Sequence, residues 1–299
     1  MRFSQLRNLL ALTTHSSLGS AAQALGIAQP VLTRSIQALE LELGVKLIER
    51  SARGTSLTPE GERLAVRASR VERELQMARE ELAQWRGQRH GCLSIGVSPV
   101  VHLLRLPRAI ALFRKEYPGI RVNVSEGLFS QVFSSCDSGK LDFAVGPLAL
   151  AGGPVPATYV AEHLFTSETA VFARKGHPLA GSRSLLGLLG ADWVSGDPCE
   201  GPGDVICRTF TAQGLPPPVP VMHCDSAVSA LEFVAETDLL AMLPRRLIEV
   251  GRLRDALRLV PVQEPIAAAA VCLVYRRDAI PTPAARALMA AIRLCAKTV

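Results

Sequence analysis

The sequence predicts an α/β protein in three segments: a small helical domain with a β wing, one long helix, and a larger domain of alternating strands and helices. Three observations lead to this fold class. Two short helical runs separated by a glycine precede residue 45, and apolar residues then repeat at a 4-3 spacing from Leu64 to Trp85. From residue 92 onward, strand-like and helix-like runs alternate. A chain of 299 residues is long enough to form several domains with cores of their own.

Composition is that of an ordinary soluble protein, with 48% hydrophobic and 20% charged residues. No apolar run approaches the length of a membrane span, and the N-terminus lacks a signal peptide, so we expect a cytoplasmic protein. Residues 1–90 carry 13 Lys and Arg against nine Asp and Glu, whereas residues 91–299 carry 20 against 18. This excess is compatible with a polyanionic partner for the N-terminal third, although a modest basic excess is also common on solvated surfaces.

The first segment predicts a helix-turn-helix. Leu6, Leu9, Leu10 and Thr13 form one face of the first helix. "SAAQALG" opens the second with Ser20 and Gln23 in the capping-box pattern, and Gly26 supplies the turn. Pro30 then fixes φ near the start of the next helix.

That next helix has two distinct faces. Leu32, Ile36, Leu39 and Leu43 form an apolar stripe at helical spacing. The opposite stripe carries a guanidinium, an amide and a hydroxyl, at Pro30, Thr33, Arg34 and Gln37. The second helix of such a motif enters the major groove of DNA, where Arg recognises guanine, Gln adenine, and Thr a thymine methyl or a phosphate. The alternative is a solvated face of a small helical bundle.

The segment "GVKLIERSARGTSLTPEG" predicts a β wing, because two β-like runs flank a basic turn. Its polar residues, Arg50, Ser51, Arg53 and Thr55, would reach backbone phosphates or the minor groove. From the A-A-x-x-L element of "AAQALG" to the L-T-x-x-G element of "SLTPEG", the chain resembles the winged helix-turn-helix of LysR-type transcriptional regulators. The resemblance implies a DNA-binding domain over residues 1–57. Ala28 stands where the family usually has Ser, so we expect Gln29 to cap the helix instead.

A long helix follows over residues 58–87, starting at Thr58-Pro59. Its apolar residues follow the heptad of a coiled coil: Leu64, Ala68, Val71, Leu75, Ala78, Leu82 and Trp85. A helix of this length spans about 40 Å. We expect it to mediate dimerisation, which agrees with the linker helix that the resemblance implies. The resemblance also implies homotetramers.

The third segment, residues 92–299, predicts a parallel sheet covered by helices on both faces. "EGLFSQVFSSCDSGKLDFAVGP" resembles the effector domain of the same family, which is similar to periplasmic ligand-binding proteins. The resemblance implies two α/β subdomains. We place the crossings near Phe165 and Pro265, so that subdomain I comprises about residues 92–165 and 266–299 and subdomain II about residues 166–265.

Loops after the strands are the candidates for an effector site, because ligands of open α/β sheets bind beyond the carboxyl ends of strands. Ser98-Pro99 looks like a helix start, whose free N–H groups favour an anionic or strongly polar ligand. The resemblance places matching positions along the cleft between the subdomains. The predicted site comprises Ser98, Pro99, Val100, Gly127, Leu128, Phe129, Ser130, Gly146, Pro147, Ser195, Gly196, Asp225 and Ser226. The alternative is that these are ordinary caps and turns.

The sequence contains no catalytic, metal or cofactor pattern. "GVSPV" around Ser98 lacks the second glycine of a nucleophile elbow, no phosphate-binding glycine loop occurs, and the six histidines have no ligand spacing. His177 precedes a proline in an expected turn. Seven cysteines without a close pair indicate reduced thiols. Cys199 and Cys207 match the region where a peroxide-sensing branch of the family has two cysteines, but Asp197, Glu200 and Asp204 would raise their pKa and favour inert thiols.

Two function classes remain. The first is a DNA-binding regulator, not an enzyme, that is controlled by a small polar or anionic metabolite and has double-stranded DNA, a second copy of itself and RNA polymerase as partners. The second is a ligand-binding or scaffolding protein whose helix-turn-helix contacts protein. The composition of the wing and of the outer helix face favours the first.

Overall fold

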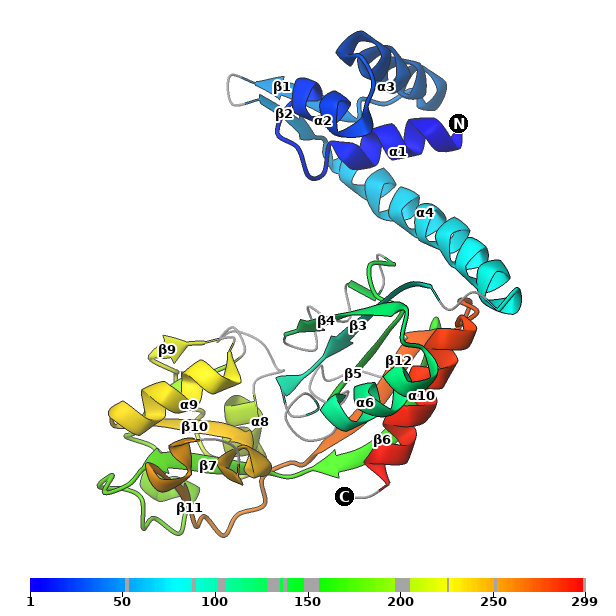
Figure 1. Cartoon of the computed structure of the whole chain (residues 1–299). Helices are drawn as coiled ribbons and strands as arrows, with labels where there is room; N and C mark the ends of the chain where they lie inside the picture. Colours follow the sequence, from blue (N-terminus) through cyan, green and yellow to red (C-terminus); the bar gives the residue numbers. More distant parts are fainter. Residues whose placement is uncertain are drawn as a thin grey trace. The chain divides into compact units, whose positions relative to one another are not determined.

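The computed structural model describes residues 1–51, 54–87, 90–99, 101, 106–127, 135–136, 139–147, 156–196, 205–224, 226–249 and 252–297 (Figure 1). It divides into two compact units. The first consists mainly of Met1–Leu82, and the second contains most of the chain from Ala83 onward.

The first unit is a three-helix domain with a two-stranded wing and a long helix. Its elements are α1 (Phe3–Ala11), α2 (Leu18–Leu25), α3 (Gln29–Leu43), β1 (Ile48–Ser51), β2 (Gly54–Leu57) and α4 (Pro59–Trp85). The core contains buried side chains from all three short helices and from the residue before the wing. Fully buried are Leu9 of α1, Leu32, Ile36 and Leu39 of α3, and Leu47; α2 adds Leu18, Ala21 and Ala22.

Three details of the predicted helices are wrong. The N-cap of α2 is Ser17, whose side chain accepts from the Ser20 N–H at 3.1 Å, so Ser20 lies inside the helix and forms no capping box with Gln23. Helix α1 ends at Ala11, which leaves Thr13 in an exposed turn. Leu43, in the last turn of α3, is 39% exposed and does not continue the buried stripe. Gly26 does form the turn after α2, with φ 67°.

The first sheet of the second unit has the strand order β4-β3-β5-β12-β6. Its strands are β3 (Gly91–Val97), β4 (Ile120–Glu126), β5 (Phe143–Pro147), β6 (Tyr159–Ser167) and β12 (Ala269–Arg276). Helices α6 (Leu106–Glu116) and α10 (Pro283–Ala296) lie side by side on one face (Figure 1). Their buried residues pack against Ile95, Val97, Phe143, Val145 and Leu273 in the largest core cluster.

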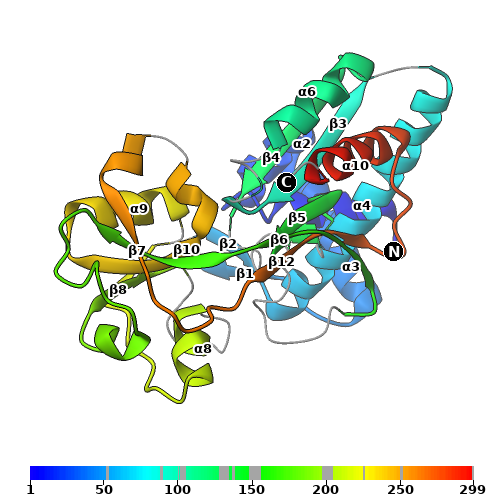
Figure 2. The same ribbon diagram turned by 90° about the horizontal axis from the view of Figure 1, so that it is seen from below.

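The second sheet has the order β11-β7-β10-β8-β9. Its strands are β7 (Thr169–Arg174), β8 (Asp192–Ser195), β9 (Met222–His223), β10 (Leu239–Pro244) and β11 (Leu257–Val260). Figure 2 shows α8 (Val205–Ala212) and α9 (Ala227–Glu236) on opposite faces. Accordingly, Val171 of β7 packs with α8 and Phe172 packs with α9. Short 3-10 helices η2 (Leu185–Leu188), η3 (Arg245–Glu249) and η4 (Arg252–Asp255) connect these elements.

Both sheets are mixed, so the prediction of a parallel sheet is wrong in part. Strands β4, β3 and β5 are parallel, but β12 is antiparallel to both β5 and β6. In the second sheet β7 is antiparallel to β10 and β11. The reason is the path of the chain, which leaves the first sheet after Ser167 and returns to it at Ala269. There β12 pairs between β5 and β6, which come about a hundred residues earlier in the sequence.

Within the part of the chain that the structure describes, no helix is both long enough and apolar enough to cross a membrane.

Candidate DNA-binding and effector sites

Helix α3 separates its two faces as the sequence predicts. Leu32, Ile36 and Leu39 are completely buried. On the opposite side, Gln29, Pro30, Arg34 and Gln37 are exposed and Thr33 is partly buried. A row of donors and acceptors on the outer face of a short, well-packed helix can enter a DNA groove without disturbing the core.

Two apolar side chains on this outer face were missed by the sequence analysis. Val31 is 53% exposed in the first turn, and Leu41 is 86% exposed near the end of the helix. Exposed aliphatic groups beside Arg34 and Gln37 suit contact with thymine methyl groups. The sequence could have indicated these two residues, because both are apolar but lie off the buried stripe of α3.

The N-terminus of α3 has no side-chain cap. Ala28 is the N-cap and Pro30 lies in the first turn, so Gln29 is inside the helix and does not take the capping role expected of it. Pro30 has no N–H, and the N–H groups of Val31 and Leu32 donate to the Ala28 carbonyl at 2.9 and 3.3 Å. In the first turn, the Gln29 N–H is therefore the group that can bind a backbone phosphate.

The wing is an antiparallel pair in which Arg50 faces Thr55 and Ser51 faces Gly54. The Thr55 N–H donates to the Ser16 carbonyl at 2.9 Å, which attaches the wing to the turn before α2. At Gly54, with φ 123°, a Cβ would lie 2.4 Å from the same carbonyl oxygen, so only glycine fits. Arg53 lies outside the described residues, as do the side chains of Arg50 and Ser51.

Glu40 joins α3 to the base of the wing. One carboxylate oxygen accepts from the Leu47 N–H at 2.8 Å and the Ile48 N–H at 3.3 Å, and the other accepts from Lys46 Nζ at 3.0 Å. Burial raises the pKa of Glu40, but these hydrogen bonds outweigh burial and hold the pKa below its ordinary value. Sequence reasoning missed this residue, because its partners depend on the turn that follows the helix.

The apolar heptad residues of α4, here called the seam, are exposed to solvent over the C-terminal part of the helix. Leu64 packs against the core of the first unit and Ala68 is buried. Further along, the seam side chains are 42–69% exposed, at Val71, Leu75, Leu82 and Trp85. Such a stripe of large apolar side chains is typical of a helix that pairs with a second helix.

The strand ends of the first sheet bring part of the predicted effector site together. The Ser98 N–H donates to the Val145 carbonyl of β5 at 2.9 Å, and the Gly127 N–H donates to the Val97 carbonyl of β3 at 3.2 Å. Ser98 and Gly127 therefore lie at one edge, beside the end of β5. Gly146 and Pro147 were expected in a loop, but both belong to β5 and pair with β12.

Ser98 has the most unusual environment in this group. Its side chain is 5% exposed, and its hydroxyl has no hydrogen-bond partner among the residues that the structure describes. The Val101 N–H donates to the Ser98 carbonyl at 3.0 Å, as at a helix start, and Pro99 follows in that turn. A buried, unsatisfied hydroxyl is uncommon in proteins and is a candidate for contact with a ligand.

The second sheet gathers the remaining predicted residues. Ser195 ends β8 and is 2% exposed, and its carbonyl accepts from the Cys224 N–H at 2.9 Å; Gly196 follows. Ser226 is the N-cap of α9, where its hydroxyl accepts from the Ser229 N–H at 3.3 Å. The hydroxyl of Ser226 thus has a structural use that the hydroxyl of Ser98 lacks.

Several predicted positions lie outside the described residues. These are Val100, Leu128, Phe129, Ser130 and Asp225, together with Cys199. Cys207 is partly buried on α8. Burial raises the pKa of the Cys272 thiol, which keeps that cysteine protonated and unreactive.

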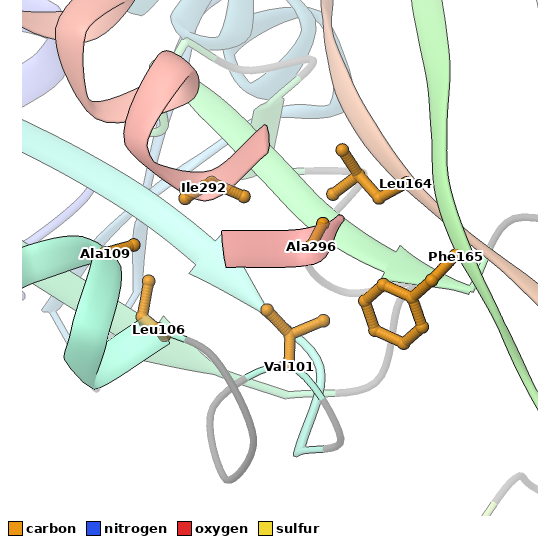
Figure 3. A pocket seen from close by; sticks show the side chains of 7 residues that line it. All are labelled: Val101, Leu106, Ala109, Leu164, Phe165, Ile292 and Ala296. Carbon is orange, nitrogen blue, oxygen red and sulfur yellow. The ribbon is translucent and has the colours of Figure 1, made fainter. Parts of the chain in front are cut away.

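One apolar pocket lies beside the first sheet (Figure 3). It holds about 240 Å³ of empty space, part of it open to solvent, and is lined by apolar side chains alone: Val101, Leu106, Ala109, Leu164, Phe165, Ile292 and Ala296. None of the predicted effector residues lines it. Without a polar group, it does not suit a polar or anionic ligand.

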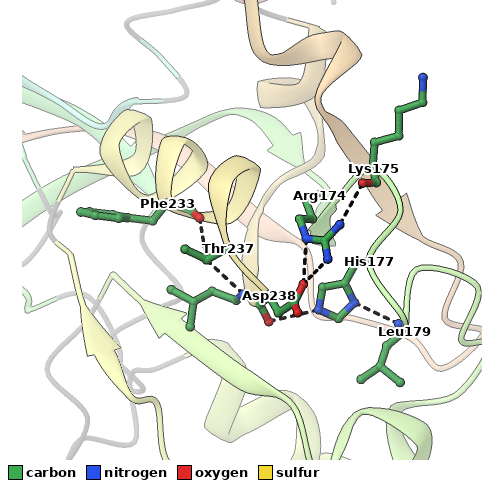
Figure 4. A network of polar contacts seen from close by, with 8 residues as sticks. Arg174, Lys175, His177, Leu179, Phe233, Thr237 and Asp238 are labelled. Atoms are coloured by element: carbon green, nitrogen blue, oxygen red, sulfur yellow. Dashed lines mark hydrogen bonds and ion pairs between the residues drawn. The ribbon is translucent and has the colours of Figure 1, made fainter.

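His177 belongs to a structural network at one end of β7 (Figure 4). It is 7% exposed; its Nδ1 accepts from the Leu179 N–H at 2.9 Å, and its Nε2 lies 3.0 Å from the Asp238 carbonyl oxygen. The Asp238 carboxylate binds Arg174 at 2.6 Å. Both ring nitrogens are therefore occupied in holding turns together. Among the described residues, no group of His, Cys, Asp and Glu could hold a metal ion.

Comparison with known proteins finds two matching family models. The model for bacterial regulatory helix-turn-helix proteins of the lysR family matches residues 3–62, and the model for the LysR substrate binding domain matches residues 86–294. The HTH-type transcriptional regulator GalR of Pseudomonas putida is 29% identical over 278 residues, which cover 92% of this chain and 69% of that protein. An SDS degradation transcriptional activation protein of a Pseudomonas species is 31% identical over 257 residues, covering 83% and 82%.

Solved structures share the fold over nearly the whole chain. Full-length CbnR in complex with its target DNA has a TM-score of 0.68 at 19% identity, covering 99% of this chain and 100% of that one. A full-length OxyR variant from Pseudomonas aeruginosa has a TM-score of 0.69 at 23% identity, covering 99% and 95%.

Proposed function

We propose that this chain, which belongs to the LysR family of DNA-binding transcriptional regulators, reads its operator with α3 and the wing and responds to a small polar or anionic metabolite bound near Ser98. Members of this family bind DNA as oligomers through a helix-turn-helix and carry a substrate-binding domain for an effector. Its relatives are regulators rather than enzymes. We place its action in the cytoplasm, where its operator would be.

DNA reading is assigned to the outer face of α3. Arg34 would recognise a guanine and Gln37 an adenine, with Thr33 and Val31 beside them for thymine methyl groups. The Gln29 N–H at the start of α3 would bind a phosphate and so fix the depth at which the helix enters the groove. The wing would add sequence-independent phosphate contacts through Arg50, Ser51, Arg53 and Thr55.

Pairing is assigned to the exposed seam of α4. Two copies that pack Val71, Leu75, Leu82 and Trp85 against each other would remove large apolar side chains from water and place two DNA-binding domains on one operator. We propose a dimer through this helix and a tetramer as the complete assembly, as in the family, with RNA polymerase as a further partner.

The observation that carries the effector proposal is the hydroxyl of Ser98. It is buried and has no partner in the described part of the chain, and it lies where three strand ends meet at the start of a helical turn. A carboxylate or a hydroxyl-rich group would satisfy this hydroxyl by forming a hydrogen bond with it. Gly127 at the same edge allows close approach of a ligand. Binding would change the relation of the two subdomains and, through it, the DNA-binding domains.

The test is a thermal-shift screen of the full-length protein against small carboxylates and polyols, followed by DNA binding with each hit. We expect a hit to stabilise the wild type and to change its DNA affinity. Ser98→Ala should lose both responses and keep its effector-free DNA affinity, whereas Ser229→Ala, which removes an exposed hydroxyl, should keep both. A hit that acts equally on wild type and Ser98→Ala would place the effector site elsewhere.

A further inference from the structure

A continuous set of close contacts links α3, the base of the wing and the first turn of α4. It begins at Glu40, which is 7% exposed and accepts hydrogen bonds from the backbone of Leu47 and Ile48. Glu40 lies on α3 but away from the exposed face, so its side chain does not contact DNA in the proposed binding mode. Its hydrogen bonds instead connect α3 to the start of the wing.

Thr58 continues the connection on the other side of the wing. Its hydroxyl donates to the Lys46 carbonyl at 2.7 Å and accepts from the Gly61 N–H at 3.0 Å, while its own N–H donates to the Leu47 carbonyl at 3.0 Å. The side chain is 5% exposed. One buried hydroxyl therefore caps α4 and also binds the backbone of residues 46–48, the same segment whose N–H groups donate to Glu40 on α3.

Gly61 brings α4 into direct contact with the same segment. A Cβ at this position would lie 2.1 Å from the Leu47 carbonyl oxygen and 3.0 Å from its carbonyl carbon. Gly61 is buried within the helix and has no left-handed backbone, so close approach alone requires glycine there. Since the contacting atoms belong to the backbone, a larger residue can be accommodated only if α4 moves away from the wing.

We propose that Glu40, Thr58 and Gly61 form a rigid joint that sets the direction in which α4 leaves the DNA-binding domain, and thereby the half-site spacing that the dimer accepts. This inference rests on the proposed reading of DNA by α3 and the proposed pairing through α4. Because a helix of 27 residues is about 40 Å long, a tilt of about ten degrees at its base displaces its far end by about 7 Å. Such a shift corresponds to about two base-pair steps of 3.4 Å along DNA.

The experiment compares one half-site with two half-sites at varied spacing. The half-site is the sequence that the full-length wild type selects from random duplexes. Duplexes with two copies are then made with the spacing changed one base pair at a time. The variants are Gly61→Ala and Thr58→Val, with Glu40→Gln as a third. The controls are Thr58→Ser, which keeps the hydroxyl, and Glu62→Ala, which alters an exposed neighbour on α4.

For the three variants we expect the half-site Kd to stay within about twofold of wild type, while the affinity for the best wild-type spacing falls about tenfold and the preferred spacing moves or broadens. Both controls should keep the wild-type preference. The joint is refuted if the variants retain the wild-type spacing preference. It is also refuted if the affinities for the half-site and the full site fall by the same factor along with the melting temperature, because that result indicates general destabilisation. If Gly61→Ala does not fold, Thr58→Val and Glu40→Gln decide the question.

The same experiments distinguish failure of the joint from failure of the proposed DNA reading or of the proposed pairing. A wild type that selects no sequence would contradict the proposed DNA reading, and a wild type that is monomeric by light scattering would contradict pairing through α4. Neither result would depend on the joint.

Discussion

Two serines near the carboxyl ends of strands differ in what their hydroxyl groups do. Ser226 caps α9, whereas Ser98 is buried with its hydroxyl unpartnered among the described residues. In the absence of ligand, Ser226→Ala should lower the free energy of unfolding by about 1 kcal/mol. Ser98→Ala should leave it unchanged or raise it by about 1 kcal/mol, because the alanine leaves no polar group unsatisfied. Urea denaturation of the effector-free protein measures both, and a marked loss of stability in Ser98→Ala would mean that its hydroxyl already has a partner.

Glu40 makes the stability of the first unit depend on pH. Its pKa is lowered in the folded protein, so its contribution is fully present above the ordinary pKa near 4.5 and is lost as the pH falls through the lower, folded value. At pH 7, Glu40→Gln should reduce the free energy of unfolding by about 1.5–3 kcal/mol, the usual worth of hydrogen bonds to a buried charge. Melting curves from pH 7 down to pH 3 should show the gap between wild type and variant closing. A gap that stays constant across this range would contradict the assignment.

At the scale of elements, a charged residue in the seam of α4 should prevent two copies of the chain from pairing through this helix. Leu75→Glu places a carboxylate among side chains that pairing would bury, so the full-length protein should shift toward monomer in light scattering. Glu74→Ala, one residue away from the seam, is the matched control and should leave the mass unchanged. An unchanged oligomer in Leu75→Glu would show that pairing uses another surface.

The wing should behave as a phosphate-binding element. Arg50→Ala and Arg53→Ala should each weaken binding to all duplexes by a similar factor and reduce the slope of log affinity against log salt by about one. Titrations of a selected and a scrambled duplex at several salt concentrations make the comparison. A loss confined to the selected duplex would mean that the wing reads bases.

Local patterns allowed most elements to be predicted. The stripe of Leu32, Ile36 and Leu39 and the heptad of α4 depend on residues within a few turns, and both helices form where expected. Features that depend on distant partners were missed. The antiparallel β12 requires strands about a hundred residues away, and Glu40 has a role only because the chain turns back at Leu47. Ser17 rather than Ser20 caps α2, although either serine fits the local pattern; the helix begins at Leu18, which is buried in the core.

For the whole molecule, the candidate sites divide between the two units. The DNA-reading face, the joint and the seam as far as Leu82 belong to the first unit, whereas Trp85 belongs to the second, together with Ser98 and the other effector candidates. A regulator of this kind requires coupling between them, because an effector changes DNA binding only by the difference in its affinity for two states of the protein. An effector that alters DNA affinity must therefore bind more tightly or more weakly in the presence of operator, by the same factor.

The most direct test of the central claim is the fluorescence anisotropy of full-length wild type and Arg34→Ala with a selected duplex and its scrambled counterpart at 150 mM salt. We expect the wild type to prefer the selected duplex by at least about a thousandfold. Arg34→Ala should lose about 1–3 kcal/mol of that preference while keeping its affinity for scrambled DNA and its melting temperature. Equal affinity of the wild type for both duplexes, or an unchanged preference in Arg34→Ala, would contradict the reading of DNA by α3.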